Sequence, residues 1–384
     1  MAFDLTEEQR LLQESALRFV EREYDGARRR RLVVSEDGFD PANWTQFAEL
    51  GWLGVALPDA HGGSDGGMAE IAVLMEAIGR GLIVEPFLST VVLGAGMVAE
   101  LGSDDQKADL LPAIAGGTRR IAVAMGEPQA RYDLHDVAAR AEETEGGYRL
   151  TGHKSVVLDA AAADIVIVPA RTAGESRDKD GITAFLVDPA GDGVELRTYR
   201  TIDGLRGADV LLDGAVVQVD RVLGPPGGAL PALRCAADRA AVALGAEAVG
   251  IMAVLVEMTG DYLKTREQFG TTLNRFQALQ HRLVDMYTAQ QTAEALAFRA
   301  AAGFDAMDAA EGARAASAVK AETGRAGKFV GQQAIQLHGG IGMTDEYDAG
   351  HYFKRLSIID SLFGNTDHHL RRLADLKYGP AAGR

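Results

Sequence analysis

The most informative stretch of this sequence reads Arg266-Glu267-Gln268-Phe269-Gly270 and closes a long helical pattern. A second stretch, at the end of a later helical pattern, reads Gln336-Leu337-His338-Gly339-Gly340-Ile341-Gly342. Arg266 offers a planar cation to a phosphate, Phe269 offers a ring for stacking, and the glycine pair lets backbone N–H groups approach an anion closely. Taken singly, Arg266 could instead pair with a carboxylate, and the glycines could simply end a helix.

Outward from these stretches, apolar residues at helical spacing predict helices on both sides of a β-rich middle. Thr6 and Gln9 form a capping-box pattern at the start of the first helix. Further N-terminal helices are predicted over 44–50, 68–79, 88–101 and 104–114. Four long C-terminal helices, predicted over 230–265, 275–302, 309–338 and 352–376, favour a helical bundle.

Short β-prone runs separated by Gly and Asp turns occupy the middle of the chain, which is typical of a sandwich or barrel. They are predicted over 121–125, 137–141, 148–151, 165–169, 182–187, 194–199, 210–212 and 215–219. The predicted fold is therefore α+β, with an N-terminal all-helical domain, a middle β-barrel or sandwich domain and a C-terminal four-helix bundle. The predicted domain bounds are residues 1–117, 118–224 and 229–384.

Composition excludes several classes of function. The net charge of −16 argues against nucleic acid as a partner, since phosphate binding needs a concentrated positive surface. Cys235 is the only cysteine, so an intrachain disulfide is impossible. The acidic start of the chain does not look like a signal peptide, and charged residues interrupt the apolar stretch 236–256. These features favour a cytoplasmic protein that does not enter a membrane.

Common catalytic motifs do not occur in the sequence. We find no phosphate loop, no G-x-G-x-x-G after a strand, no H-E-x-x-H and no G-x-S-x-G. Asp367, His368 and His369 are adjacent, but neighbouring side chains on a helix point about 100° apart and cannot readily share one ion. The sequence therefore predicts no metal site.

Together and in this order, the two C-terminal motifs resemble those of the acyl-CoA dehydrogenase family, with Gln277 between them. Glu127-Pro128 in the middle of the chain and the turn at Leu57-Pro58 are similar to that family as well. The resemblance covers essentially the whole chain. It implies FAD as cofactor, an acyl-CoA substrate and an electron-transfer flavoprotein as electron acceptor. It also implies that the adenine and pyrophosphate end of a neighbouring subunit's FAD is bound by Arg266, Phe269, Gln277, Gln336, Gly339 and Gly340.

The sequence departs from the family where the flavin ring is usually held. The family's T-E-P-x-A-G-S-D becomes Gly126-Glu127-Pro128-Gln129-Ala130-Arg131-Tyr132-Asp133, and its W-I-T-N becomes Val156-Val157-Leu158-Asp159. The two threonine hydroxyls and the aromatic wall are missing. Backbone N–H groups could still contact the isoalloxazine, but the usual side-chain contacts cannot be made.

The usual catalytic base is missing too. The family's E-G-T becomes Phe363-Gly364-Asn365-Thr366, and a phenyl ring cannot accept an α-proton. Some relatives carry the base just before an Arg on the first bundle helix, which makes Asp238 the candidate catalytic residue. Asp is one methylene shorter than Glu, with about 1.5 Å less reach. The alternative is an ordinary ion pair of Asp238 with Arg234 or Arg239.

This mixture of losses resembles the heteromeric acyl-CoA dehydrogenases of steroid-degrading actinobacteria. A homotetramer and a heterotetramer both remain open at this point. The resemblance implies α,β-dehydrogenation of an acyl-CoA thioester, with a steroid-derived acyl group as one possibility. The alternatives are a non-catalytic partner subunit that completes a neighbour's FAD site, and a flavin oxidase or monooxygenase of the same fold. The acyl chain cannot be identified, since the residues expected to line the pocket are ordinary Leu, Val, Met and Ala.

Overall fold

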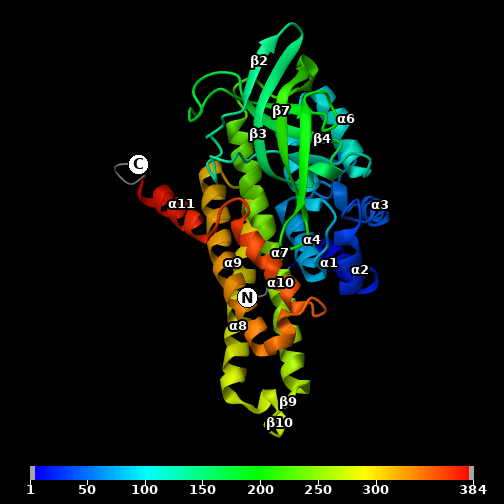
Figure 1. Cartoon of the computed structure of the whole chain (residues 1–384), viewed down its shortest axis with the longest axis vertical. Coiled ribbons are helices and arrows are strands. Elements are labelled where there is room, and N and C mark those ends of the chain that lie inside the picture. Colours follow the sequence, from blue (N-terminus) through cyan, green and yellow to red (C-terminus); the bar gives the residue numbers. More distant parts are fainter. Residues whose placement is uncertain (1–4, 380–384) are drawn as a thin grey trace. The chain divides into compact units, whose positions relative to one another are not determined.

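The computed structural model describes residues 5–379 and confirms a helical N-terminal part, a β-sheet in the middle and a helical C-terminal part (Figure 1). The chain divides into two compact units. A helical unit contains the chain up to Arg31, the segment Met68–Ile83 and everything from Ala241 onward. A second unit contains Leu32–Gly67 and Val84–Ala240. The three domain bounds given above stay a prediction, and residues 1–4 and 380–384, at the ends of the first and third domains, lie outside the described residues.

The helical unit is built from long helices whose caps are readable in the sequence. Thr6 and Gln9 form the predicted capping box at the start of α1, and Asp308 with Glu311 forms another at the start of α9. In this unit α1 packs on α4, α8 on α9, and both α10 and α11 on α9. The bounds are α1 Glu7–Glu23, α4 Met68–Gly81, α8 Gln277–Phe304, α9 Ala309–His338, α10 Ala349–Ser361 and α11 Thr366–Tyr378. Two further helices, α2 Gly26–Val34 and α7 Leu230–Thr265, contain the points where the chain passes from one unit to the other.

Helices α4 and α7 approach so closely that only glycine fits at the contact. A side chain at Gly79 would clash with the carbonyl of Glu247, and one at Gly250 would clash with the carbonyl of Glu76. Just beside this crossing, Arg355 of α10 forms a buried ion pair with Glu247, with Nε–Oε1 and Nη2–Oε2 distances of 2.6 and 2.9 Å. This ion pair joins α10 to α7.

The second unit holds a mixed eight-stranded sheet in the order β6-β7-β3-β2-β4-β5-β8, with β1 parallel to β4. Strands β4 and β5 are buried along their whole length and form the centre of the core. The strands are β1 Ile121–Val123, β2 Arg140–Thr144, β3 Gly147–Leu158, β4 Ile165–Arg171, β5 Ile182–Val187, β6 Val194–Arg200, β7 Arg206–Gln218 and β8 Val222–Leu223. Its helical segments are α3 Pro41–Glu49, the π-helix Leu88–Gly94, α5 Ala95–Leu101 and α6 Asp104–Ala115.

The observed strands differ from the predicted ones at three places, in β7, β2 and β3. The runs 210–212 and 215–219 are one continuous strand, β7, because Gly214 adopts φ +74° and forms a bulge opposite Leu150 and Thr151. The run 137–141 is not a strand over its first residues, since β2 begins at Arg140. Strand β3 in turn extends well past the predicted Thr151, to Leu158.

The last predicted helix, 352–376, is wrong as a single element. It is divided into α10 and α11 by the connection Leu362–Asn365, in which Phe363 and Gly364 have φ values of +54° and +112°. Both values lie in the left-handed region, which ends a right-handed helix. The predicted helix 88–101 similarly begins as a π-helix before continuing as α5.

Helix α7 is long and apolar enough to cross a membrane by length and composition alone. However, 72% of its most apolar window is buried inside the structure, as expected for a core helix. The second stretch of that kind, Leu88–Leu101, is too short for a span.

Candidate active site

The first C-terminal motif forms an exposed hairpin at the end of α7. The short strands β9 Glu267–Gln268 and β10 Thr271–Thr272 pair around a turn in which Phe269 and Gly270 both have positive φ. The Phe269 ring is 89% exposed and meets Phe276 edge to face, with centroids 6.0 Å apart. The Arg266 backbone N–H donates to Tyr262 at 2.8 Å, while its exposed guanidinium has no ion-pair partner within residues 5–379. The alternative of an intrachain carboxylate partner for Arg266 is therefore not observed.

The second motif is an open turn at the end of α9. Gly339 has φ +65°, and a Cβ added at Gly339 or Gly340 would meet nothing within 4 Å, so the backbone is accessible from outside. Gln336 and, at the start of α8, Gln277 are exposed as well. All six residues expected to bind the cofactor therefore lie on the surface of the described chain. That they bind FAD remains a prediction.

An aromatic stack joins the two motifs. The His338 ring lies between Tyr262 and Tyr347, with centroid distances of 4.6 and 5.0 Å. Its Nδ1 donates to the Ala334 carbonyl at 2.8 Å, while its buried Nε2 makes no hydrogen bond within 3.5 Å among the described residues, although the Met258 backbone is near enough to influence the pKa of the ring. Burial lowers the pKa of His338, so the ring is neutral at pH 7. The stack fixes the end of α7 against the end of α9.

In the second unit, the stretches that replace the family's flavin contacts lie side by side. Ser155 donates its N–H to the Gly126 carbonyl at 2.9 Å. Val156 has φ +54°, a conformation that is unusual for a β-branched residue, and its side chain is 54% exposed. Its N–H donates to Asp209 Oδ1 at 3.3 Å and is no longer available to a ligand. The N–H groups of Met125 and Gly126 make no hydrogen bond within residues 5–379.

Asp209 is the centre of the contacts that hold this bulge. Its carboxylate also receives the Tyr199 hydroxyl at 3.2 Å and contacts His153 Nε2 at 3.0 Å. The hydrogen bonds from His153, the Val156 amide and Tyr199 keep the pKa of Asp209 below its usual value, although burial works in the opposite direction. The sequence analysis did not single out Asp209, because its role depends on a bulge between β3 and β7 that local patterns do not reveal.

A buried polar network supports the same stretches from inside the unit. Lys154 and Glu127 form an ion pair at 2.6 Å with both side chains almost fully buried. Glu127 also accepts the N–H groups of Ala138 and Ala139, and Gln129 donates to it at 2.9 Å. Burial lowers the pKa of Lys154, with the Glu127 charge opposing that effect. Lys154 lies on the same face of β3 as the buried Leu150. Because every second residue of a strand faces the same side, this spacing could have predicted that Lys154 is buried.

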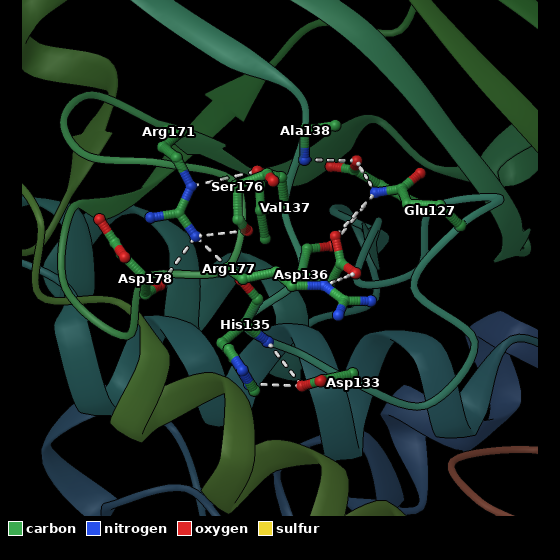
Figure 2. Close-up of polar contacts among 11 residues, drawn as sticks. Glu127, Asp133, His135, Asp136, Val137, Ala138, Arg171, Ser176, Arg177 and Asp178 are labelled. Atoms are coloured by element: carbon green, nitrogen blue, oxygen red, sulfur yellow. Dashed lines mark hydrogen bonds and ion pairs between the residues drawn. The ribbon is translucent and has the colours of Figure 1, made fainter. Parts of the chain in front are cut away.

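Figure 2 shows how Arg171 of β4 holds the neighbouring loops together. Its guanidinium donates only to backbone carbonyls, at 2.8–3.1 Å, and these belong to His135, Val137, Ser176, Asp178 and Asp180. Beside it, Arg177 donates to the Asp136 carboxylate at 2.9 Å. Residues 135–137, which directly follow the stretch 126–133 that departs from the family pattern, are thus attached to the charged loop 174–180.

The two candidate positions for a base differ in surroundings. Asp238 is 6% exposed near the start of α7, and other groups of the chain contact it, which agrees with either the catalytic or the ion-pair reading. Phe363 is half-buried in the connection between α10 and α11. Its N–H makes no hydrogen bond within the described part of the chain, and its carbonyl accepts a bond from His369 Nε2 at 3.1 Å. No group of three His, Cys, Asp or Glu residues among 5–379 is arranged to hold a metal ion.

Each of the two units, taken by itself, holds groups that suit one part of an FAD molecule. The free Arg266 guanidinium, the exposed Phe269 ring and the open glycine turn suit a dinucleotide, and the unpaired N–H groups of Met125 and Gly126 suit a polar ring edge. The hydroxyl and aromatic side chains for the flavin are lacking at Gly126, Val156 and Leu158.

Comparison with known proteins identifies the family. The N-terminal, middle and C-terminal domain models of the acyl-CoA dehydrogenases match residues 6–118, 122–213 and 231–376. Mitochondrial isovaleryl-CoA dehydrogenase of Solanum tuberosum is 28% identical over 86% of this chain and 80% of its own length.

Two solved structures are similar over nearly the whole chain. A variant of the Tcur3481-Tcur3483 steroid ACAD is 32% identical, with a TM-score of 0.87 over 97% of this chain and 98% of the other. The ChsE4-ChsE5 complex from Mycobacterium tuberculosis is 28% identical, with a TM-score of 0.87 over 99% of this chain and 100% of the other. Together with the family matches, these show that the chain belongs to the FAD-dependent acyl-CoA dehydrogenase family, whose members are oxidoreductases acting on CH–CH groups.

Proposed function

We propose that this chain is one subunit of a heteromeric acyl-CoA dehydrogenase, and that it serves the adenine end of FAD far better than the flavin end. The observation that carries the proposal is the contrast between the two regions. Arg266, Phe269 and the Gly339-Gly340 turn are present and exposed, whereas the side chains that would hold a flavin ring are lost at Gly126, Val156 and Leu158.

The exposed surface of the C-terminal motifs favours a binding site completed by another chain. Phe269 is 89% exposed, and Arg266 has no ion-pair partner in the described chain. Exposed groups of this kind often mark a binding surface. Both would be covered if a neighbouring subunit placed the adenine half of its cofactor here. The similarity to the ChsE4-ChsE5 complex supports a partner of the same fold but different sequence.

The bound FAD would supply hydride acceptance, and the chain's own residues would bind and orient the thioester. With Phe363 in the usual position of the base, proton removal needs another carboxylate. We propose Asp238 for this role, with a carboxylate of the partner subunit as the alternative. The substrate we propose is an acyl-CoA with a bulky, steroid-like acyl group, since one similar structure is described as a steroid ACAD. An electron-transfer flavoprotein is the proposed electron acceptor.

The test is to purify the chain alone and together with a second acyl-CoA dehydrogenase chain from the same genome. Each preparation is mixed anaerobically with butyryl-CoA or with a CoA thioester of a steroid side chain, and flavin reduction is followed. We expect reduction only in the two-chain assembly and faster with the steroid thioester. Rapid reduction in the single-chain preparation would contradict the heteromeric proposal, and rapid reaction of the reduced flavin with O₂ would favour an oxidase.

A further inference from the structure

We propose that Lys320 and His369 are positioning residues that hold the backbone of Phe363 in place, so that its free N–H can donate a hydrogen bond to the carbonyl of an acyl thioester. The inference rests on the proposed function, because it takes the connection between α10 and α11 to face the substrate. Lys320 lies outside the motifs identified in the sequence, and His369 was considered there only as a metal ligand beside Asp367 and His368. Both are almost fully buried in the helical unit.

The connection between α10 and α11 has a conformation that needs support. Phe363 has φ +54°, which costs free energy for a residue with a side chain, and Gly364 follows with φ +112°. A side chain at Gly364 would also clash with the His369 ring. A strained backbone of this kind persists only where its surroundings fix it.

His369 supplies one of the fixing bonds, and its partners define its tautomer. The Phe363 carbonyl, 3.1 Å from Nε2, can only accept, so Nε2 carries the proton. Nδ1 therefore accepts, and the Ser317 hydroxyl 3.2 Å away donates to it. Both ring nitrogens are used, and the ring is 1% exposed. The imidazole thus links a fixed point on α9 to the carbonyl of Phe363.

Lys320 fixes the other side of the connection. Its amino group donates to the carbonyls of Ile359 and Asp360, the latter at 3.2 Å, in the last turn of α10. A hydrogen-bond donor suits this place because unpaired carbonyls gather at a helix C-terminus. The Asp360 carboxylate in turn receives the N–H and the hydroxyl of Thr366, at 3.0 and 2.8 Å. Asp360 therefore joins the end of α10 to the start of α11.

A glycine on α9 makes this arrangement possible. A side chain at Gly324 would clash with both the Asp360 carboxylate and the Thr366 hydroxyl. Helix α9 carries Ser317, Lys320 and Gly324 on one face, and this face packs directly against the connection between α10 and α11. Each of these hydrogen bonds holds either the backbone or a helix-capping group within residues 359–369. The Phe363 N–H, in contrast, has no partner in the described chain. A left-handed backbone that is held from both sides in this way is typical of a functional site.

The test compares His369→Gln with His369→Leu in the FAD-loaded assembly. The amide nitrogen of Gln can replace Nε2 as the donor to Phe363, whereas Leu fills a similar volume without donating. We expect His369→Gln to keep kcat within about threefold. We expect His369→Leu to lower kcat by about 10²-fold with little change in KM, since misplacing a group that acts in the transition state costs about that much.

A second variant keeps the proposal testable if His369→Leu fails to assemble. Ser317→Ala removes only the hydroxyl that fixes the tautomer, and we expect kcat to fall by about 3- to 10-fold in a variant that still assembles and binds FAD, with a small decrease in melting temperature. Equal kcat values for wild type, His369→Leu and Ser317→Ala would overturn the positioning role while leaving the proposed dehydrogenase function intact. A wild-type assembly that no CoA thioester reduces would instead overturn the proposed function, and the role of Phe363 with it.

Discussion

Tyr262 stacks on His338, with ring centroids 4.6 Å apart and ring planes at 36°, and this contact joins the ends of α7 and α9. His338 lies inside the second C-terminal motif, and Tyr262 lies a few residues before Arg266, where the first motif begins. The stack explains why two motifs far apart in the chain form one exposed region.

Arg266→Ala should reduce FAD affinity without changing the melting temperature. The exposed guanidinium has no ion-pair partner in the described chain, so nothing else is lost when it is removed. A charge-assisted hydrogen bond contributes about 1.5–3 kcal/mol, or roughly 10- to 100-fold in affinity. The measurement is flavin content after extensive dialysis of the assembly. Lys264→Ala is the matched control, because Lys264 is an exposed cation at the end of the same helix that pairs with Asp261 at 2.9 Å. Full flavin retention in Arg266→Ala would exclude the phosphate contact.

Gly340→Val should be at least as damaging to FAD binding. A Cβ at this position meets nothing within 4 Å of the chain, so the folded subunit should accept the side chain. A branched side chain would nevertheless block the approach of a pyrophosphate to the backbone. Isothermal titration of the apo-assembly with FAD measures the effect. Gly96→Ala serves as the control, since Gly96 also has open space but lies on α5, far from the motif in sequence. Equal affinities for the two variants would contradict the assignment.

How much the sequence predicts depends on whether a feature is local. Helix caps such as Thr6 with Gln9, and the exposed motifs around Arg266 and Gly339, could be recognised because neighbouring residues define them. The bulges at Gly214 and Val156 could not, because each is set by the register between β3 and β7. The contacts of Lys320 and of His369, which the sequence suggested only as a possible metal ligand, could not be predicted for a similar reason. Their partners lie far away in the sequence or in the irregular connection between α10 and α11, which was predicted as part of one continuous helix over 352–376.

Asp238→Asn tests the proposed base. If Asp238 removes the α-proton, the variant assembly should bind FAD and acyl-CoA normally and turn over at least about 10²-fold more slowly, because an amide cannot accept the proton. Single-turnover flavin reduction separates this step from product release. Glu257→Gln is a suitable control, since Glu257 is an exposed carboxylate on the same helix that pairs with Arg80 at 2.9 Å. Unchanged reduction would assign the base to the partner subunit.

Stability should rise with pH through the effect of Lys320. Burial lowers the pKa of Lys320 to about 7 from 10.5, so between these values the unfolded chain binds a proton that the folded chain does not. Raising the pH across that range therefore favours the folded state, by at most about 1.4 kcal/mol per pH unit. Lys320→Met should flatten the dependence of the unfolding free energy between pH 7 and 9. Comparison with wild type removes the contribution of Lys154, whose lowered pKa acts in the same direction. Identical slopes in the two proteins would show that Lys320 stays charged when buried.

The most direct test of the central claim is the amount of FAD per chain. The protein is purified alone and with its cognate partner chain, dialysed, and assayed for flavin released on denaturation. The contrast between the exposed residues proposed for the adenine end and the lost residues proposed for the flavin end predicts a flavin-poor protein alone and a clearly higher flavin content per chain in the two-chain assembly. One FAD bound to every chain of a purified single-chain oligomer would contradict it.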